Sequence, residues 1–328
     1  MGTSGKKLPQ NFIQTDGSVK FSVLICTYNR HELLEKSLKA LMGDTVEKPD
    51  EVVVVNGGDG RADEVVKKFQ GGSGIELKLI KVVNKNLASN RNLGIPHCTG
   101  DIVAMTDDDA EVFPDWVTQM KRVHSEHPEA GAEGGLVLGT NIDSLVGKVA
   151  DLITFPSWDK ACYTRTLPGV NIAYKRAAIE RVGLQDETLF RGEDVDYNWR
   201  ILQLGYKIYF DPAIKVYHYH RPTLRGFLNQ HYMYGRAYYL VRRKWPEMYC
   251  VYPHGIKNPK DFLKFINFFV ALIYQPLFHL RRIPKWNEKF SALPLLFILG
   301  FLWKAGMIIE KNKLAAIDNQ GKKIRCES

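Results

Sequence analysis

From residue 21 onward, short apolar runs alternate with segments that have helical spacing. The runs are rich in Val, Ile and Leu, and each fits a buried strand. The intervening segments place apolar residues on one helical face, as Leu33, Leu34, Leu38 and Leu41 do in the first. Apolar strands joined by helices predict an α/β fold with a mostly parallel, Rossmann-like sheet flanked by helices. The expected strands are residues 21–26, 50–55, 76–83 and 101–105, and the expected helices are 30–42, 62–69 and 87–98.

The pattern after residue 112 is less regular. A helix is expected over 114–128, with a proline at its start, and another over 193–205, with Gly205 as its stop. Two short strands are expected at 207–211 and 214–220. A long basic and aromatic helix is expected over 223–245.

The C-terminal part contains two strongly apolar segments, 262–280 and 290–309. Each approaches the ~20 residues that an α-helix needs to cross a bilayer. The linker between them has four basic residues and a Trp. Basic, Trp-bearing flanks favour a hairpin that spans or lies on a membrane, over a buried helical hairpin or a dimer interface. The chain therefore divides into a flexible leader (1–20), a main domain (21–245) and a membrane-associated helical region (246–328). The leader lacks the pattern of a secretory signal.

Composition narrows the choice of partners. The formal net charge is +9, which suits phosphate-bearing substrates, nucleic acid or an anionic membrane surface. The basic residues gather in 221–244 and beside the apolar tail without a nucleic-acid-binding motif, so no nucleic acid partner is expected. The five cysteines have no CxxC spacing, which argues against a zinc site or a disulfide framework and fits a reducing cytosol.

Polar clusters follow three of the expected strands. They begin at Thr27, Asn56 and Asp107, and the carboxyl ends of parallel strands form the usual ligand site of such sheets. The third cluster is the carboxylate triplet 107–109, whose like charges repel one another. A divalent cation would offset that repulsion, and Mg²⁺ or Mn²⁺ binds through one or two carboxylates together with substrate phosphates. The triplet predicts a metal–diphosphate site, with a turn that caps the next helix as the alternative.

Seven segments in chain order resemble the family 2 glycosyltransferases with a GT-A fold. They are VLICTYNR, VVVVNGGDG, NLASNRNLGI, TDDDA, PGVNIAYKR, GEDVDYNWRILQLGYKIYFDP and VYHYH, and the resemblance covers about residues 21–243. It implies a Mn²⁺- or Mg²⁺-dependent, inverting transfer of a sugar from a nucleotide-diphosphate sugar to a hydroxyl of a lipid-linked or polysaccharide acceptor. Asn56 stands where this family usually has an Asp that contacts the base, so a UDP-sugar is expected while GDP and dTDP stay open.

The resemblance also implies roles for individual residues. Asp194 would be the general base, with Glu193 as its acidic neighbour, and Asp109 and His218 would bind the metal, with His220 as the alternative ligand. Asp107 would bind the ribose and Asp108 would support it. Gly169 and Asn171 would line the acceptor side. The other expected nucleotide-sugar contacts are Thr27, Tyr28, Arg30, Asn56, Asp59 and Arg91.

Two rival functions share this fold. A processive polysaccharide synthase would usually carry a QxxRW motif, but the chain offers only the loosely similar QHYMYGR and no multi-span channel. A catalytically inactive nucleotide-sugar-binding scaffold would not need Asp107, Asp109 and Asp194 together. Transfer of single sugars at the cytoplasmic face of the cell membrane is therefore expected, and the oligomeric state is left open.

Overall fold

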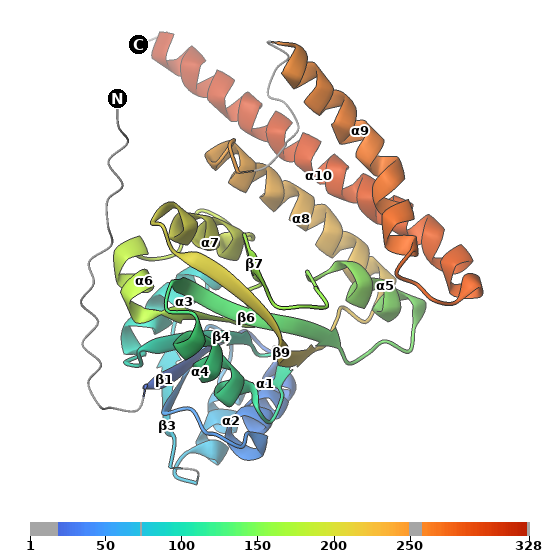
Figure 1. Cartoon of the computed structure of the whole chain (residues 1–328). Coiled ribbons are helices and arrows are strands. Elements are labelled where there is room, and N and C mark those ends of the chain that lie inside the picture. Colours follow the sequence, from blue (N-terminus) through green and yellow to red (C-terminus); the bar gives the residue numbers. More distant parts are fainter. Residues whose placement is uncertain (1–18, 73, 249–257, 327–328) are drawn as a thin grey trace, which may run out of the picture.

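The computed structural model describes residues 19–72, 74–248 and 258–326, with side chains up to residue 317. A nine-stranded sheet with the order β3-β2-β1-β4-β8-β6-β9-β5 forms the centre of this described part, and β7 pairs with β9 at one end (Figure 1). Most of the expected leader lies outside the described residues. The strands are β1 Phe21–Thr27, β2 Glu51–Asn56, β3 Glu76–Lys81, β4 Ile102–Asp107, β5 Ala110–Val112, β6 Ala130–Gly139, β7 Cys162–Thr164, β8 Ile172–Lys175 and β9 Lys207–His218.

The first half of the sheet is parallel, as the apolar runs predict. Leu24 of β1 lies between Val53 of β2 and Met105 of β4. All three side chains are buried, because helices cover both faces of the sheet. Alternate residues serve the two faces: Val23 belongs to one apolar core and Leu24 to the other. The predicted α/β class and the four N-terminal strands are confirmed.

The second half of the sheet is mixed and was harder to predict. The two strands expected at 207–211 and 214–220 form one strand, β9, which bulges where Gly135 pairs with Asp211 and Leu136 with Lys215. Strand β6 was missed because its first six residues, AGAEGG, are small or polar and include no β-branched residue. A Cβ atom on Gly134 would lie 2.1 Å from the carbonyl oxygen of Asn171, so the close approach of β8 requires a glycine.

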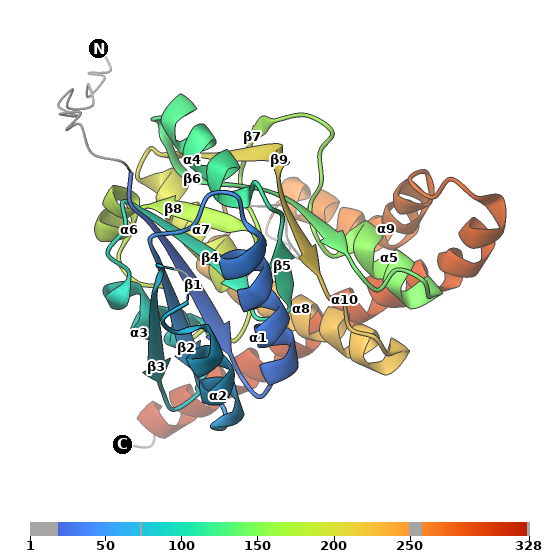
Figure 2. The same cartoon turned by 90° about the horizontal axis from the view of Figure 1, so that it is seen from below.

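Helices α1, α2 and α4 pack on one face of the sheet and α3, α6 and α7 on the other (Figure 1 and Figure 2). The helix expected at 30–42 changes to a π-helix, Lys39–Asp44, and the one at 87–98 ends in a 3₁₀ turn, Ile95–His97. The α-helices are α1 His31–Leu38, α2 Arg61–Phe69, α3 Leu87–Gly94, α4 Trp116–Glu126, α5 Leu145–Ile153, α6 Arg176–Val182, α7 Glu193–Gln203, α8 Leu224–Lys244, α9 Pro259–Leu280 and α10 Trp286–Cys326.

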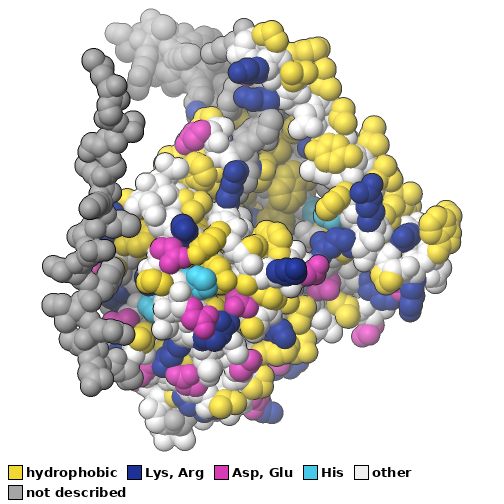
Figure 3. Space-filling model, in the orientation of Figure 1, with side chains coloured by type: hydrophobic (Ala, Val, Ile, Leu, Met, Phe, Trp, Pro, Cys, Tyr) yellow, Lys and Arg dark blue, Asp and Glu magenta, His cyan; other side chains and the backbone are white. Residues whose placement is uncertain are grey.

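The two C-terminal apolar segments form a helical hairpin, α9 and α10, as expected, although α10 is longer than predicted (Figure 1). Helix α10 packs on α5 and α8, where Leu295 and Leu299 meet Val149 and Phe227. By length and composition, both helices of the hairpin could cross a membrane. Only 17% of the apolar stretch of α9 and 33% of that of α10 are buried, so apolar side chains line the outer edge of the hairpin (Figure 3).

Candidate active site

The predicted site residues meet at the carboxyl ends of β1 and β4, where a cavity of about 350 Å³ opens. Asp107 ends β4, and the turn into β5 carries Asp108 and Asp109. His218 arrives from the end of β9, because Ala110 of β5 pairs with it across the sheet. The amino end of α7 brings Asp194 to the lining of the same cavity.

Asp107, Asp109 and His218 form a cluster that fits a divalent cation. One potential ligand atom from each lies within 4.8 Å of the others, and His218 Nε2 is 3.4 Å from Asp109 Oδ1. The buried Oδ1 of Asp109 has no hydrogen-bond partner among the described residues, so its lone pairs are available to a metal. Two carboxylates and one imidazole suit Mn²⁺ or Mg²⁺. His220 lies outside this cluster and faces Asp151 at 3.5 Å.

Asp108 does not line the cavity, and its side chain holds the turn between β4 and β5 through contacts with Thr27 and Arg30. It is 1% exposed, accepts a hydrogen bond from Thr27 Oγ1 at 2.8 Å and pairs with Arg30 at 3.2 Å. Burial raises the pKa of Asp108 to about 7. Arg30 also binds Asp109. Burial alone would raise the pKa of Asp109, but the neighbouring His218 and the charge of Arg30 lower it to about 2. Arg30 therefore offsets part of the repulsion within the carboxylate triplet.

Arg91 connects the metal cluster with the start of α7. It is 2% exposed and lies 3.1 Å from both Asp107 Oδ1 and Glu193 Oε1. Burial would lower the pKa of Arg91, but the two carboxylates outweigh this and raise it. Arg91 also donates to the carbonyl oxygen of Gly169 at 3.2 Å. A Cβ atom at Gly169 would lie 2.6 Å from the guanidinium, so only glycine fits beside this bridge.

Asp194 lines the cavity and is held by backbone amides. The amide of Gly169 donates to its Oδ2 at 3.0 Å, and the amide of Val195 donates to its Oδ1 at 2.8 Å. Gly192 supplies the left-handed turn before α7, with φ of 77°. Burial and the charge of Asp194 raise the pKa of neighbouring Glu193 to about 7, against the effect of Arg91. Both residues line the cavity, but Glu193 is buried and paired with Arg91, whereas the Asp194 carboxylate is held by the two backbone amides.

Besides Asp108, three predicted contacts do not line the cavity. Asn56 is 3% exposed; its amide donates to Asp63 at 2.8 Å and to the carbonyl oxygen of Asp59 at 2.9 Å. The Asp59 side chain pairs with Arg61 at 2.7 Å. Asn171 accepts from the indole of Trp116 at 2.9 Å. Asn56 and Asn171 thus have structural partners here, and the roles of all three in binding stay predictions.

The cavity also contains residues that the sequence reasoning did not single out. Arg221 follows the VYHYH segment directly, and Gln230 and Tyr234 come from QHYMYGR, so both segments contained a signal. Gln230 donates to the Tyr234 hydroxyl at 2.8 Å. Asn86 and Asn90 lie in the segment NLASNRNLGI and had a signal as well, whereas nothing local in the sequence marks other missed lining residues such as Asn84, Phe155 and Phe190.

The fold and this carboxylate cluster at the strand ends define an α/β protein of the GT-A type. The mannosyltransferase PcManGT from Pyrobaculum calidifontis, solved in complex with GDP-Man and Mn²⁺, has a similar fold, with a TM-score of 0.62 at 18% identity. The match covers 90% of this chain and 88% of that one. The chain belongs to glycosyl transferase family group 2, whose family model matches residues 102–308, and the model of glycosyl transferase family 2 matches residues 22–148. The family resemblance is therefore confirmed.

Two curated relatives are similar over part of their length. A glucosyl-dolichyl phosphate glucuronosyltransferase from Haloferax volcanii is 29% identical over 191 residues, which are 54% of this chain and 59% of that protein. A poly-beta-1,6-N-acetyl-D-glucosamine synthase from Staphylococcus aureus is 27% identical over 227 residues, 66% of this chain and 54% of that protein. The matches thus span little more than half of the relatives.

Proposed function

We propose that this protein is a metal-dependent, inverting glycosyltransferase that moves a sugar from a nucleotide-diphosphate sugar to an acceptor hydroxyl. The observation that carries the proposal is one cavity that is lined both by a cluster of potential metal ligands and by an oriented carboxylate. Asp107, Asp109 and His218 form the cluster, and Asp194 is the carboxylate held by two backbone amides. A scaffold that only bound nucleotide sugars would not need this carboxylate in addition to the metal cluster.

In the proposed reaction Asp194 accepts the proton of the acceptor hydroxyl as that oxygen bonds to the anomeric carbon. The bond between the anomeric carbon and the diphosphate oxygen breaks in the same step, so the configuration inverts. The amides of Gly169 and Val195 hold the carboxylate in place for this transfer. Asp107, Asp109 and His218 would hold the cation, which supplies positive charge that stabilises the leaving diphosphate.

The donor is proposed to be a UDP-sugar, with GDP- and dTDP-sugars as alternatives. The alternatives are kept for two reasons. The related structure holds GDP-Man, and the side-chain amide of Asn56 already donates a hydrogen bond to Asp63. Purified protein should be screened with UDP-, GDP- and dTDP-sugars, with and without Mn²⁺, by thermal shift and donor hydrolysis. A ligand that binds only the folded protein, at 100 times its Kd, adds about 2.7 kcal/mol. No metal-dependent shift with any donor would contradict the proposal.

The proposed acceptor is lipid-linked or a growing polysaccharide, matching what the names of the two curated relatives say of those proteins. Processive synthesis is the second candidate, favoured by the synthase relative and by Gln230 and Tyr234 in the cavity lining. Single transfer is preferred because Tyr234 and Gly235 stand where a QxxRW motif has Arg and Trp. Product length in a timed reaction separates the two, since only the processive enzyme releases long chains at low turnover.

The hairpin is proposed to lie on the cytoplasmic face of the membrane rather than to cross it. Its turn is tied to the main domain, since Arg282 donates to the carbonyl oxygen of Leu152 at 3.1 Å and to Ser157 at 2.7 Å. Farther along α10, Glu310 pairs with Arg236 of α8 at 2.7 Å. Between these ties α10 runs for about 40 Å at 1.5 Å per residue, so a spanning orientation would draw the main domain into the bilayer.

The outer face of α9 fits this placement. Its exposed apolar side chains would enter the interface, while the basic turn and Trp286, which is 70% exposed, would meet anionic headgroups. The apolar side chains are Phe262, Leu263, Ile266, Phe269, Val270, Ile273, Leu277 and Phe278.

A further inference from the structure

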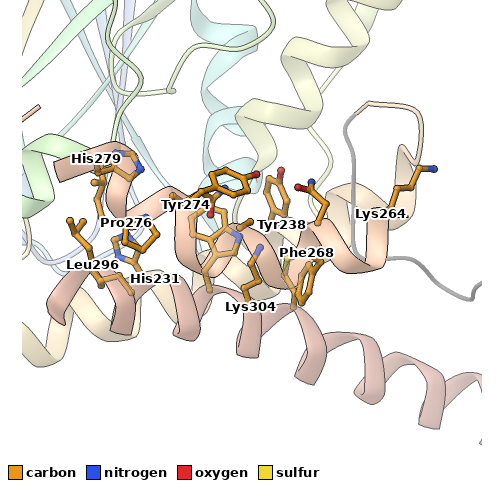
Figure 4. Close-up of a pocket in the computed structure, with 17 residues that line it drawn as sticks. His231, Tyr238, Lys264, Phe268, Tyr274, Pro276, His279, Leu296 and Lys304 are labelled. Atoms are coloured by element: carbon orange, nitrogen blue, oxygen red, sulfur yellow. The ribbon is translucent and has the colours of Figure 1, made fainter. Parts of the chain in front are cut away.

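A second cavity, of about 410 Å³, lies between α8, α9 and α10 (Figure 4). It is separate from the candidate active site because the two cavities use different faces of α8. Gln230 and Tyr234 line the active-site cavity, whereas His231 and Tyr238 line this one. Helix α8 therefore stands between the second cavity and Asp194, and nothing in the proposed transfer reaction uses it.

The polar lining of this cavity favours an anion. No described residue that lines it is an Asp or a Glu, while Lys264 and Lys304 both line it. The other polar lining groups include the side-chain amides of Asn267 and Gln275, which can donate hydrogen bonds. The cavity thus offers positive charge and hydrogen-bond donors without a carboxylate to neutralise them.

Lys304 is the central feature of this lining. Its Nζ lies 4.2 Å from the ring centroid of Phe268, and within the described residues no carboxylate is within ion-pair distance of it. Figure 4 shows the Lys304 ammonium directed into the cavity toward Tyr274 and Tyr238. A partly buried ammonium without a counter-ion is costly, and an anionic ligand would remove that cost. The ammonium of Lys264, the second lysine of the lining, lies 3.7 Å from a carboxylate oxygen of Asp261.

The remaining walls are apolar. Pro276 and Leu296 lie at one end of the cavity, as Figure 4 shows, and Ala271, Leu299 and Met307 add further apolar surface. The volume falls in the range of about 300–1,000 Å³ that is typical of small-molecule sites. The exposed apolar face of α9 adjoins this region, so an alkyl chain could enter from a surrounding membrane. The site therefore combines a place for an anionic group with a place for hydrocarbon.

We propose that this cavity binds a membrane lipid with an anionic phosphate headgroup. The phosphate pairs with Lys304, and part of an acyl chain lies against Pro276 and Leu296. Phosphate is favoured over a carboxylate because its additional oxygens can accept from several of the surrounding donors. The lipid fills the space between the hairpin and α8 and so stabilises the docking of α9. Since α8 separates it from Asp194, this lipid is distinct from the sugar acceptor.

The test compares the melting temperature of the purified full-length chain in neutral detergent micelles with and without phosphatidylglycerol. The wild type should be stabilised by phosphatidylglycerol, more weakly by zwitterionic phosphatidylcholine, and not by diacylglycerol, which lacks the phosphate. Lys304→Met should lose at least half of the stabilisation, and Lys304→Arg should keep it. Lys285→Met is the matched comparison: it removes the same charge from the exposed turn of the hairpin, outside the cavity lining, and should lose clearly less of the stabilisation than Lys304→Met.

Several outcomes would overturn the proposal. If Lys304→Met kept the full shift in melting temperature, or if diacylglycerol stabilised the wild type as much as phosphatidylglycerol, the cavity would not be a phosphate site. An equal loss in Lys285→Met would mean that lipid binds only by surface charge. If Lys304→Met does not fold, Gly300→Leu replaces it: a Cβ at Gly300 makes only an ordinary contact, 3.9 Å from Leu272, and the added side chain would fill the cavity. A full phosphatidylglycerol shift in Gly300→Leu would likewise contradict the proposal.

Discussion

Asp107, Asp108 and Asp109 are adjacent in the chain, yet their side chains have three different environments. Asp107 faces Arg91, Asp108 is buried against Thr27, and Asp109 faces His218. Because the middle carboxylate turns inward, the outer two can share one cation. The compensation that three like charges require therefore comes from arginines and, in the proposed function, from a metal.

Asp194→Asn tests the proposed general base. The amide keeps the size of the side chain but cannot accept the proton, so we expect turnover to fall by about 10²–10⁴. The Mn²⁺-dependent thermal shift with the donor should remain, because Asp194 is not part of the cluster of potential metal ligands. Asp159→Asn, the same change at an exposed position, is the control. Turnover within tenfold of the wild type would assign the base to another residue.

Asp109→Asn tests the metal cluster independently of the base. Loss of one of the two carboxylate ligands should abolish the Mn²⁺ dependence of donor binding, measured by titrating Mn²⁺ at fixed donor. The His220→Ala variant should retain that dependence, because His220 faces Asp151 outside the cluster. A loss of Mn²⁺ dependence in His220→Ala but not in Asp109→Asn would reverse the proposed ligand set.

Glu51 provides a pH-dependent part of the stability. It is fully buried and accepts hydrogen bonds from Lys78 at 2.6 Å and Ser22 at 2.5 Å, and also from Thr99. Burial would raise the pKa of Glu51, but these bonds lower it from 4.5 to about 2. A depressed pKa stabilises the folded protein fully above the unfolded value near 4.5 and loses this effect as the pH falls toward 2.

Glu51→Gln should therefore lower the free energy of unfolding at pH 7 by about 3 kcal/mol, at about 1.4 kcal/mol per pKa unit. The difference from the wild type should shrink when denaturant unfolding is repeated between pH 4.5 and pH 3. Glu180→Gln, at an exposed position, should change neither curve. A difference between Glu51→Gln and the wild type that is independent of pH would show that packing, not ionisation, is responsible.

At the scale of elements, the closest packing is the crossing of α8 and α10. A Cβ atom on Gly235 would lie 1.9 Å from the carbonyl oxygen of Trp303, and one on Gly306 would lie 2.3 Å from that of Tyr232. Two glycines thus let the backbones of these helices touch.

Asp196 connects α7 to the end of α8, since Trp245 donates to it at 2.7 Å and Lys244 pairs with it at 2.7 Å. Asp196 therefore links two helices, in addition to lying in the first turn of α7, where its negative charge complements the helix dipole.

Gly235→Ala should therefore destabilise the protein although alanine favours helices. The added methyl group must push α10 away, and we expect a loss of about 1–3 kcal/mol, as for overpacked cores. Denaturant unfolding in detergent measures it. Gly300→Ala is the control, because its Cβ has space and the substitution should be neutral or stabilising by up to about 1 kcal/mol. Equal stability of the two variants would contradict the close crossing.

At the scale of the whole molecule, the main domain and the hairpin form a continuous body, with α10 packed on α5 and α8 (Figure 2). The expected division at residue 245 stays a prediction, but the packing places the hairpin against the last helix of the main domain. A membrane bound by the outer face of α9 would then approach the protein from one side.

Labelling of single cysteines tests the interfacial placement. Lys285→Cys lies in the hairpin turn and Lys313→Cys near the other end of α10, and both positions are exposed. In sealed inverted membrane vesicles, a membrane-impermeant maleimide should label both, above the level of the parent protein. In right-side-out vesicles neither should react. Labelling of Lys285→Cys only in right-side-out vesicles would mean that α9 and α10 cross the bilayer.

The sequence by itself determined the α/β class, the N-terminal strands, the two apolar helices and the family. Period-2 and period-3.6 patterns are local, so a short window is enough to predict a buried strand or an amphipathic helix. The carboxylate triplet is equally local, and it predicted a metal site while leaving a helix-capping turn as the alternative. Local patterns could not predict glycine-rich β6, because its strand conformation depends on pairing with β8 and β9, which are distant in the chain.

Only the tertiary structure decided which side chains meet. Arg91 joins Asp107 and Glu193, which come from β4 and α7, and no pattern within either segment encodes that contact. His218 rather than His220 joins the metal cluster, because the pairing of β9 with β5 places His218 beside Ala110, next to Asp109. The cavity with Lys304 likewise exists only where three helices pack together. Contacts between distant segments depend on the register and crossing of whole elements, and these are set by packing rather than by local sequence.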